Sequence, residues 1–155
     1  MSTTDPRNMT KNLLGGVTAT LDDDVTAAQI IVVYSGSPEN YKQWFYIYDY
    51  DAVITIDPPR MRAAPEDRRI QDRPRRYNSD VWVHISAVDK TTVTATKLLN
   101  KINVAIEGVV GVTASTYEWN IYYQTSRPYT VPMGGYDPLW RRDIVLRYRP
   151  LAGMY

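Results

Sequence analysis

Apolar and polar residues alternate over residues 81–88, and a period of two is typical of a half-buried strand. From residue 92 to residue 109 the period changes, because apolar residues now recur at spacings of three and four. We therefore predict a strand followed by an amphipathic helix over about 91–109 that packs on the apolar face of the strand. The strand's apolar side holds Val81, Val83, Ile85 and Ala87, its other side holds Trp82, His84 and Ser86, and the helix stripe holds Leu98, Leu99, Ile102, Ala105, Ile106 and Val109.

Residue types suited to helix ends support the boundaries of this helix and indicate a second one. Asp89 and Thr91 are candidate caps at its start, and glycines follow near its end. Asp5-Pro6 is a candidate start for a short N-terminal helix, although Gly15-Gly16 disfavours its continuation.

Five further segments have the patterns of strands. Residues 29–34 form a near-continuous apolar run of the kind found inside a sheet. Residues 44–50 alternate, with Trp44, Tyr46, Tyr48 and Tyr50 on one side. The remaining three predicted strands are 52–56, 114–124 and 139–149.

These elements predict an α+β fold with a mostly antiparallel or mixed sheet of four to six strands. The main helix lies across one face, joined by the candidate N-terminal helix. We expect one domain over residues 1–155, with a long loop or arm at 57–76 and with flexible or partner-ordered ends at 1–12 and 150–155.

Composition narrows the function classes only slightly. The chain has 155 residues, a formal net charge of +1 and no cysteine, so neither a global attraction to nucleic acid nor thiol chemistry is indicated. No apolar run approaches the ~20 residues that span a bilayer, and the N-terminus lacks a secretion signal. Thirteen tyrosines and four tryptophans stand against one phenylalanine. This balance fits either half-exposed surfaces that a partner covers or a β-rich protein that favours tyrosine in its strands.

Residues 57–76 are rich in arginine and proline and poor in large apolar residues, so they cannot bury enough surface to fold alone. Arginine favours protein interfaces, and we prefer that interpretation over nucleic acid binding; a plain solvated loop stays open. The candidate interface residues are Arg60, Arg62, Arg68, Arg69, Arg73, Arg75 and Arg76 in this segment, with Tyr136, Trp140, Arg141, Arg147 and Arg149 near the C-terminus.

The sequence gives little support for a catalytic function. His84 is the only histidine and lies in the middle of a predicted strand, with no nucleophile-elbow context around any serine. A strand histidine that makes one hydrogen bond is the preferred interpretation. We predict no catalytic residues, no metal site and no cofactor, hence a protein that is not an enzyme. A small-molecule enzyme would instead require a deep apolar pocket around His84 with converging polar groups.

The order of elements from Arg76 onward resembles the tail terminator, or tail completion, proteins of tailed phages. The matching features are an arginine- and acid-bearing loop, the strand Asp80–Val88, a helix at 92–109, the strand 117–124 and the final strand Asp143–Tyr148. The likeness covers about residues 77–149 and lies in the order of the elements, not in an invariant sequence motif. The Tyr-rich segment 41–56 and the long 57–76 loop depart from it, which leaves a neighbouring neck or connector protein as an alternative.

This resemblance implies a structural virion protein that forms a homohexameric ring, ends the tail tube and joins it to the head. The implied partners are further copies of itself, the tail tube protein and the head–tail connector or stopper protein, with DNA passing through the ring without specific recognition and with no membrane. The implied location is the tail or neck of the virion, after assembly in the host cytoplasm. The alternatives are another neck or tail assembly protein and a nucleic-acid-binding module that uses the arginine-rich loop.

Overall fold

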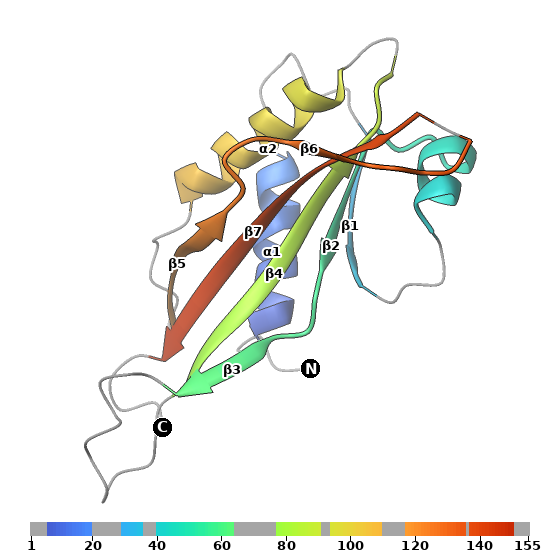
Figure 1. Ribbon diagram of the computed structural model, residues 1–155. Coiled ribbons are helices and arrows are strands. Elements are labelled where there is room, and N and C mark those ends of the chain that lie inside the picture. Colours follow the sequence, from blue (N-terminus) through green and yellow to red (C-terminus); the bar gives the residue numbers. More distant parts are fainter. Residues whose placement is uncertain are drawn as a thin grey trace, which may run out of the picture.

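The strand predicted around residues 81–88 is the centre of the observed sheet (Figure 1). The computed structural model describes residues 6–19, 29–35, 40–63, 77–90, 94–109, 117–135 and 137–150. Five strands form the main path in the order β1-β2-β4-β7-β5, and two short strands, β3 and β6, pair with the starts of β4 and β7. Their bounds are β1 Ile30–Tyr34, β2 Ala52–Ile56, β3 Arg60–Ala63, β4 Tyr77–Ala87, β5 Tyr117–Gln124, β6 Tyr129–Val131 and β7 Leu139–Pro150.

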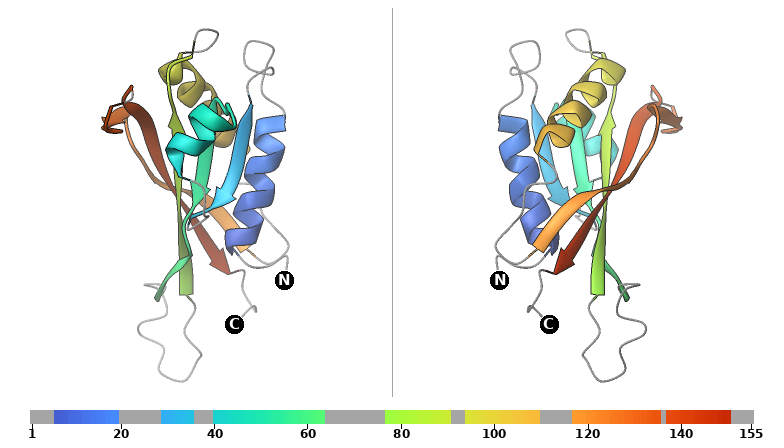
Figure 2. Two further views of the ribbon diagram at one scale, coloured as in Figure 1. Left: turned by 90° about the vertical axis from the view of Figure 1, so that its right-hand side faces the viewer. Right: turned by 90° about the vertical axis from the view of Figure 1, so that its left-hand side faces the viewer.

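The predicted α+β class is confirmed. β1 and β2 are parallel, and all other neighbouring strands are antiparallel, so the sheet is mixed. Two α-helices, α1 (Pro6–Ala19) and α2 (Ala95–Val109), pack against the same face. The right-hand view of Figure 2 shows both helices on one side of β4 and the β6–β7 hairpin on the other.

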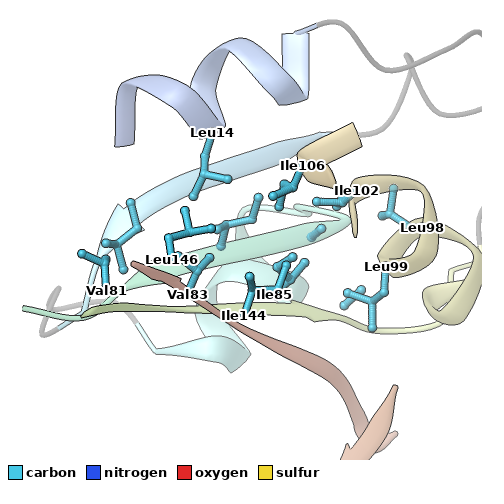
Figure 3. Packing of buried hydrophobic residues seen from close by; sticks show 14 of the residues in the cluster. Leu14, Val81, Val83, Ile85, Leu98, Leu99, Ile102, Ile106, Ile144 and Leu146 are labelled. Atoms are coloured by element: carbon cyan, nitrogen blue, oxygen red, sulfur yellow. The ribbon is translucent and has the colours of Figure 1, made fainter. Parts of the chain in front are cut away.

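The main core lies between the sheet and these two helices (Figure 3). Alternate residues of β4 and β7 meet the apolar stripe of α2, as the two periodicities predict. Burying one such aliphatic side chain contributes about 1.5–3 kcal/mol. The fully buried members include Leu14, Ile54, Val81, Val83, Ile85, Leu98, Leu99, Ile102, Ile106, Ile144, Leu146 and Tyr148.

α2 begins at Ala95, a few residues later than predicted. The Asp89 carboxylate accepts a hydrogen bond from the Ala95 amide at 2.8 Å, so this candidate cap acts on the first turn from six residues upstream. Thr91 and Gly111 lie outside the described residues, and Gly108 lies within the helix.

α1 begins at Pro6, as the Asp5-Pro6 signal predicts. The end predicted to be flexible or partner-ordered, residues 1–12, therefore includes the first half of this helix, and side chains of α1 bond to the sheet. Arg7 donates to the Ile56 carbonyl at 2.8 Å, and Thr10 hydrogen-bonds Tyr148, whose hydroxyl pKa is raised by burial to about 12. Residues 1–5 and 151–155 lie outside the described residues.

The predicted strand at 44–50 is wrong, because a short π-helix, η1 (Gln43–Ile47), forms there. Asn40 and Gln43 bond reciprocally, each side chain accepting from the other's backbone amide at 3.1 and 3.0 Å. This capping box starts a helical turn. Trp44 and Phe45 are then both buried, which a strand could not achieve for adjacent residues on one face.

Two other expectations are corrected by strand pairing. β1 is an edge strand and not an interior one, and its apolar run is explained by packing on both of its sides: Ile30 and Val32 join the main core, while Ile31 and Val33 pack toward η1. Part of the predicted 57–76 loop is a strand, because Arg60–Ala63 forms β3 and pairs with β4. Residues 64–76 lie outside the described residues.

Candidate functional site

The candidate site is the sheet face turned away from α1 and α2, here called the open face. η1 packs on its β1–β2 side through a second, smaller core that includes Trp44, Phe45 and Val53. The rest of this face carries polar and aromatic side chains from three neighbouring strands. They are Asp80, Trp82 and His84 of β4, Asp143, Val145 and Arg147 of β7, and Tyr122 and Tyr123 of β5.

An irregularity in β5 places two adjacent tyrosines on this face. The register shifts between Ile121, which pairs with Leu146, and Tyr123, which pairs with Val145. Such a bulge turns successive side chains to the same side. Tyr122 and Tyr123 are 55% and 48% exposed, and the Tyr123 ring lies 5.9 Å from that of Trp82.

Arg147 joins a buried carboxylate to one of these tyrosines. Its guanidinium donates to both oxygens of Asp80, at 2.7 and 3.0 Å, and Asp80 is only 3% exposed. The same group lies 3.4 Å above the Tyr122 ring centroid, a cation–π arrangement. The two-point contact fixes the plane of the guanidinium, which in turn packs on the Tyr122 ring.

His84 lies between two carboxylates. Nδ1 is 2.6 Å from Asp143 Oδ1, and Nε2 is 3.1 Å from Asp57 Oδ2. The hydrogen bond to Asp143 raises the pKa of His84, burial opposes this, and the hydrogen bond to Asp57 adds to it. Burial alone would raise the pKa of Asp143, but hydrogen bonds from His84 and from the Tyr129 hydroxyl outweigh burial and lower it.

This geometry favours a protonated, structural imidazole. An imidazolium donates from both nitrogens, which matches two carboxylate acceptors, whereas a general base needs one nitrogen free to accept a proton. The preferred interpretation of His84 as a residue with one hydrogen bond is therefore too simple. The ion cluster links β4 and β7 to the chain after β2, and through Tyr129 to β6.

A cleft of about 300 Å³ opens beside His84. Its lining is mainly apolar, with Val33, Trp44 and Val53 on its walls, and Asp57 and His84 also contribute. An enzyme that acts on small molecules would need a pocket of this kind and a free side chain for catalysis. In this cleft, however, both nitrogens of the His84 imidazole already bond to carboxylates. Among the residues that the structure describes, no group of three histidine or acidic residues lies close enough to hold a metal ion.

The predicted interface residues fall into three groups. Arg141, Arg147 and Arg149 lie on the open face, where Arg141 donates to the Tyr41 hydroxyl at 3.1 Å and Arg149 lies 3.9 Å from Glu118. Arg60 and Arg62 lie in β3, and Trp140 is half-buried and packs against the main core. The third group lies outside the described residues: Arg68, Arg69, Arg73, Arg75, Arg76 and Tyr136.

The chain is similar in structure to a chain of a solved virion particle. No family model matches the chain, and no curated protein sequence matches it. A similar chain occurs in a solved structure described as the virion of a native gene transfer agent particle. The two chains are 12% identical over 90% of this chain and 92% of that one, with a TM-score of 0.48. None of the described helices is long and apolar enough to cross a membrane.

Proposed function

We propose that the protein is a structural virion protein of a tailed virus, and that copies of it form a ring that ends the tail tube and joins it to the head. The observation that carries this proposal is the open face. It combines exposed tyrosines with internally paired charges, which is the composition of a protein interface. The element order β4, α2, β5, β7 also agrees with the order on which the resemblance to tail terminator proteins rests.

The charges of the open face favour a protein partner over nucleic acid. A phosphate-binding surface needs cations that are free to replace counterions. Here Arg147 bonds Asp80 and His84 bonds two carboxylates, so these two cations are neutralised by acids, while Arg141 donates to the hydroxyls of Ser86 and Tyr41. A ring subunit needs surfaces of this balanced kind, because each copy must contact two neighbours without repulsion.

We also infer that the protein is not an enzyme. What supports this inference is the state of His84, because neither of its ring nitrogens is available to accept a proton from a substrate in the neighbouring cleft.

The test is native mass spectrometry together with negative-stain imaging of the purified protein, with and without preassembled tail tubes of the virus that encodes it. The proposal expects rings, or added density that caps one end of each tube. A monomer that ignores tubes and instead shifts DNA at low salt, with loss of the shift when Arg68, Arg69, Arg75 and Arg76 become alanine, would overturn it and establish a nucleic-acid-binding module.

A further inference from the structure

The sheet ends in two edge strands, β1 on one side and β5 on the other (Figure 1). Among the residues that the structure describes, no strand pairs with the outer side of either one. β1 has no charged residue, no proline and no bulge, which are the usual devices that keep an exposed edge from pairing. All of its residues are only half-buried, and the left view of Figure 2 shows this edge between α1 and η1. β1 is therefore an edge on which a further strand can be added.

The backbone groups of β1 that point outward follow from its contacts with β2. The Asp51 amide, just before β2, donates to the Gln29 carbonyl at 2.7 Å, and the Ser35 amide donates to a β2 carbonyl at 2.9 Å. Odd-numbered residues of this strand therefore face β2, and because successive strand residues alternate, the even-numbered ones face outward. The outward N–H and C=O groups belong to Ile30, Val32 and Tyr34.

The outward groups of β5 follow in the same way from its contacts with β7. The Thr125 amide donates to the Asp143 carbonyl at 3.0 Å, so the odd-numbered residues of β7 face β5. Their direct partners on β5 are Glu118 and Asn120, whose backbone groups therefore point inward. The regular pairing ends at the bulge after Ile121. The outward N–H and C=O groups of the regular segment belong to Tyr117, Trp119 and Ile121.

The two sets of outward residues match in spacing, direction and face. Each set occupies alternate positions of a regular five-residue segment, 30–34 in β1 and 117–121 in β5. Across the sheet β5 runs antiparallel to β1, so a second copy placed beside the first with its helices on the same side meets it as an antiparallel pair. On both edges, half-buried side chains of the outward residues pack at the margin of the main core. These side chains are Ile30, Val32 and Tyr34 on β1 and Trp119 and Ile121 on β5.

We propose that β1 of one copy pairs with β5 of the next copy, antiparallel and with Val32 opposite Trp119. This inference rests on the proposed ring, which requires each copy to present two different surfaces to its two neighbours. The two edges lie at opposite ends of the sheet, so the contact is head to tail. In this register the apolar margins of the two cores cover each other. A shift by one residue would lose the hydrogen bonds and turn the side chains to the wrong faces.

Disulfide formation between two cysteine variants tests this register, because the chain has no cysteine of its own. Chains carrying Val33→Cys are mixed with chains carrying Glu118→Cys and oxidised, with and without tail tubes. The two positions are direct neighbours across the proposed pair, with Cα atoms about 4.5–5.5 Å apart, which a disulfide can bridge. Asn120→Cys replaces Glu118→Cys in the control mixture. It is exposed on the same side of β5, but it is two residues out of register and so beyond the ~7 Å limit for a disulfide.

The expected product is a mixed disulfide between positions 33 and 118, in several-fold excess over the control mixture. A yield no higher than that of the control would overturn the inference. Reciprocal pairing of two β1 strands is the competing arrangement, because their outward residues also match each other. It would join Ile31→Cys to Val33→Cys, and a dominant disulfide in that mixture would likewise overturn the inference.

The Val32→Pro substitution provides a second readout. It removes an N–H group that points outward and leaves the hydrogen bonds to β2 in place, which an edge strand tolerates. Val32→Ala is the matched control, since it also shortens the side chain but retains the N–H group. The proline variant should associate roughly tenfold more weakly than the alanine variant, because a carbonyl of the partner strand loses its donor. Equal association of the two folded variants would contradict the strand pair, and the disulfide test does not depend on the folding of either variant.

The outcomes separate this inference from the proposed function. Capped tubes without the disulfide between positions 33 and 118 would keep the ring and reject this contact. The disulfide without capping would keep the contact and reject the ring at the tube end.

Discussion

The two faces of the sheet carry different side chains although the same strands form both. On the helix-covered face, alternate residues of β4 and β7 are aliphatic and fully buried. On the open face, the residues between them form ion pairs and exposed aromatic clusters. One period-two pattern therefore separates a buried apolar face from a polar and aromatic one, because each strand residue points to one face only.

The largest expected effect lies on the helix-covered face. Replacing Ile102 with alanine removes a fully buried side chain of α2 and should cost about 2–5 kcal/mol of unfolding free energy. Urea unfolding followed by circular dichroism measures this cost. Val104→Ala, two residues along the same helix but exposed, should stay within about 0.5 kcal/mol of the wild type. Equal losses for the two variants would show that α2 does not bury the face described.

The strongest contact on the open face is the pair of Arg147 with Asp80. Arg147→Met keeps the aliphatic stem but removes two charge-assisted hydrogen bonds, so the unfolding free energy should fall by about 2 kcal/mol. Arg149→Met is the matched control, since its pair with Glu118 is exposed and 3.9 Å long and should contribute under about 0.5 kcal/mol. If both variants unfold alike, the two-point contact is absent in solution.

A smaller effect is expected at the start of the η1 turn. Asn40→Ala removes one half of the capping box and should cost about 1 kcal/mol. Asn40→Asp retains the side-chain acceptor and should remain close to the wild type. Tryptophan fluorescence reports the result because Trp44 lies in this turn. A stronger loss in the aspartate variant than in the alanine variant would argue against the cap.

The subtlest expected change is one of pH dependence. The pKa of His84 is raised above its usual 6.5 in the folded state, so its stabilising contribution is complete below pH 6.5 and is lost as the pH rises through the folded value. The pKa of Asp143 is lowered below 3.8, so its contribution is present above that pH and is lost as the pH falls through the folded value. The stability advantage of the wild type over His84→Asn should therefore shrink as the pH rises above 6.5. An advantage that is still unchanged at alkaline pH would mean that the protonation of His84 does not contribute to stability.

The elements with long, regular periodicities could be predicted from the sequence. β4, α2, β5 and β7 each repeat their pattern over at least eight residues, which leaves little ambiguity. η1 could not be assigned in the same way, because Trp44, Tyr46, Tyr48 and Tyr50 imitate the alternation of a strand. The pair Asn40 and Gln43 at capping-box spacing was the signal that distinguishes the two.

The site was harder to predict than the fold, because its contacts depend on register. His84 and Asp143 are 59 residues apart and meet only because they are direct partners across β4 and β7. Nor does the alternation of residues 117–124 reveal the bulge that turns Tyr122 and Tyr123 to one side. Arg147 was identified as an interface candidate, but its buried partner Asp80 was not, since a carboxylate at a strand start is usually solvated.

The central claim is that the open face assembles copies while the other face keeps the chain folded. The most direct measurement compares the wild type with a Tyr122→Ala/Tyr123→Ala double variant, recording urea unfolding and the fraction of tail tubes that carry a cap. The account predicts an unfolding free energy within about 1 kcal/mol of the wild type and a loss of most caps. A double variant that caps tubes as the wild type does would contradict the account.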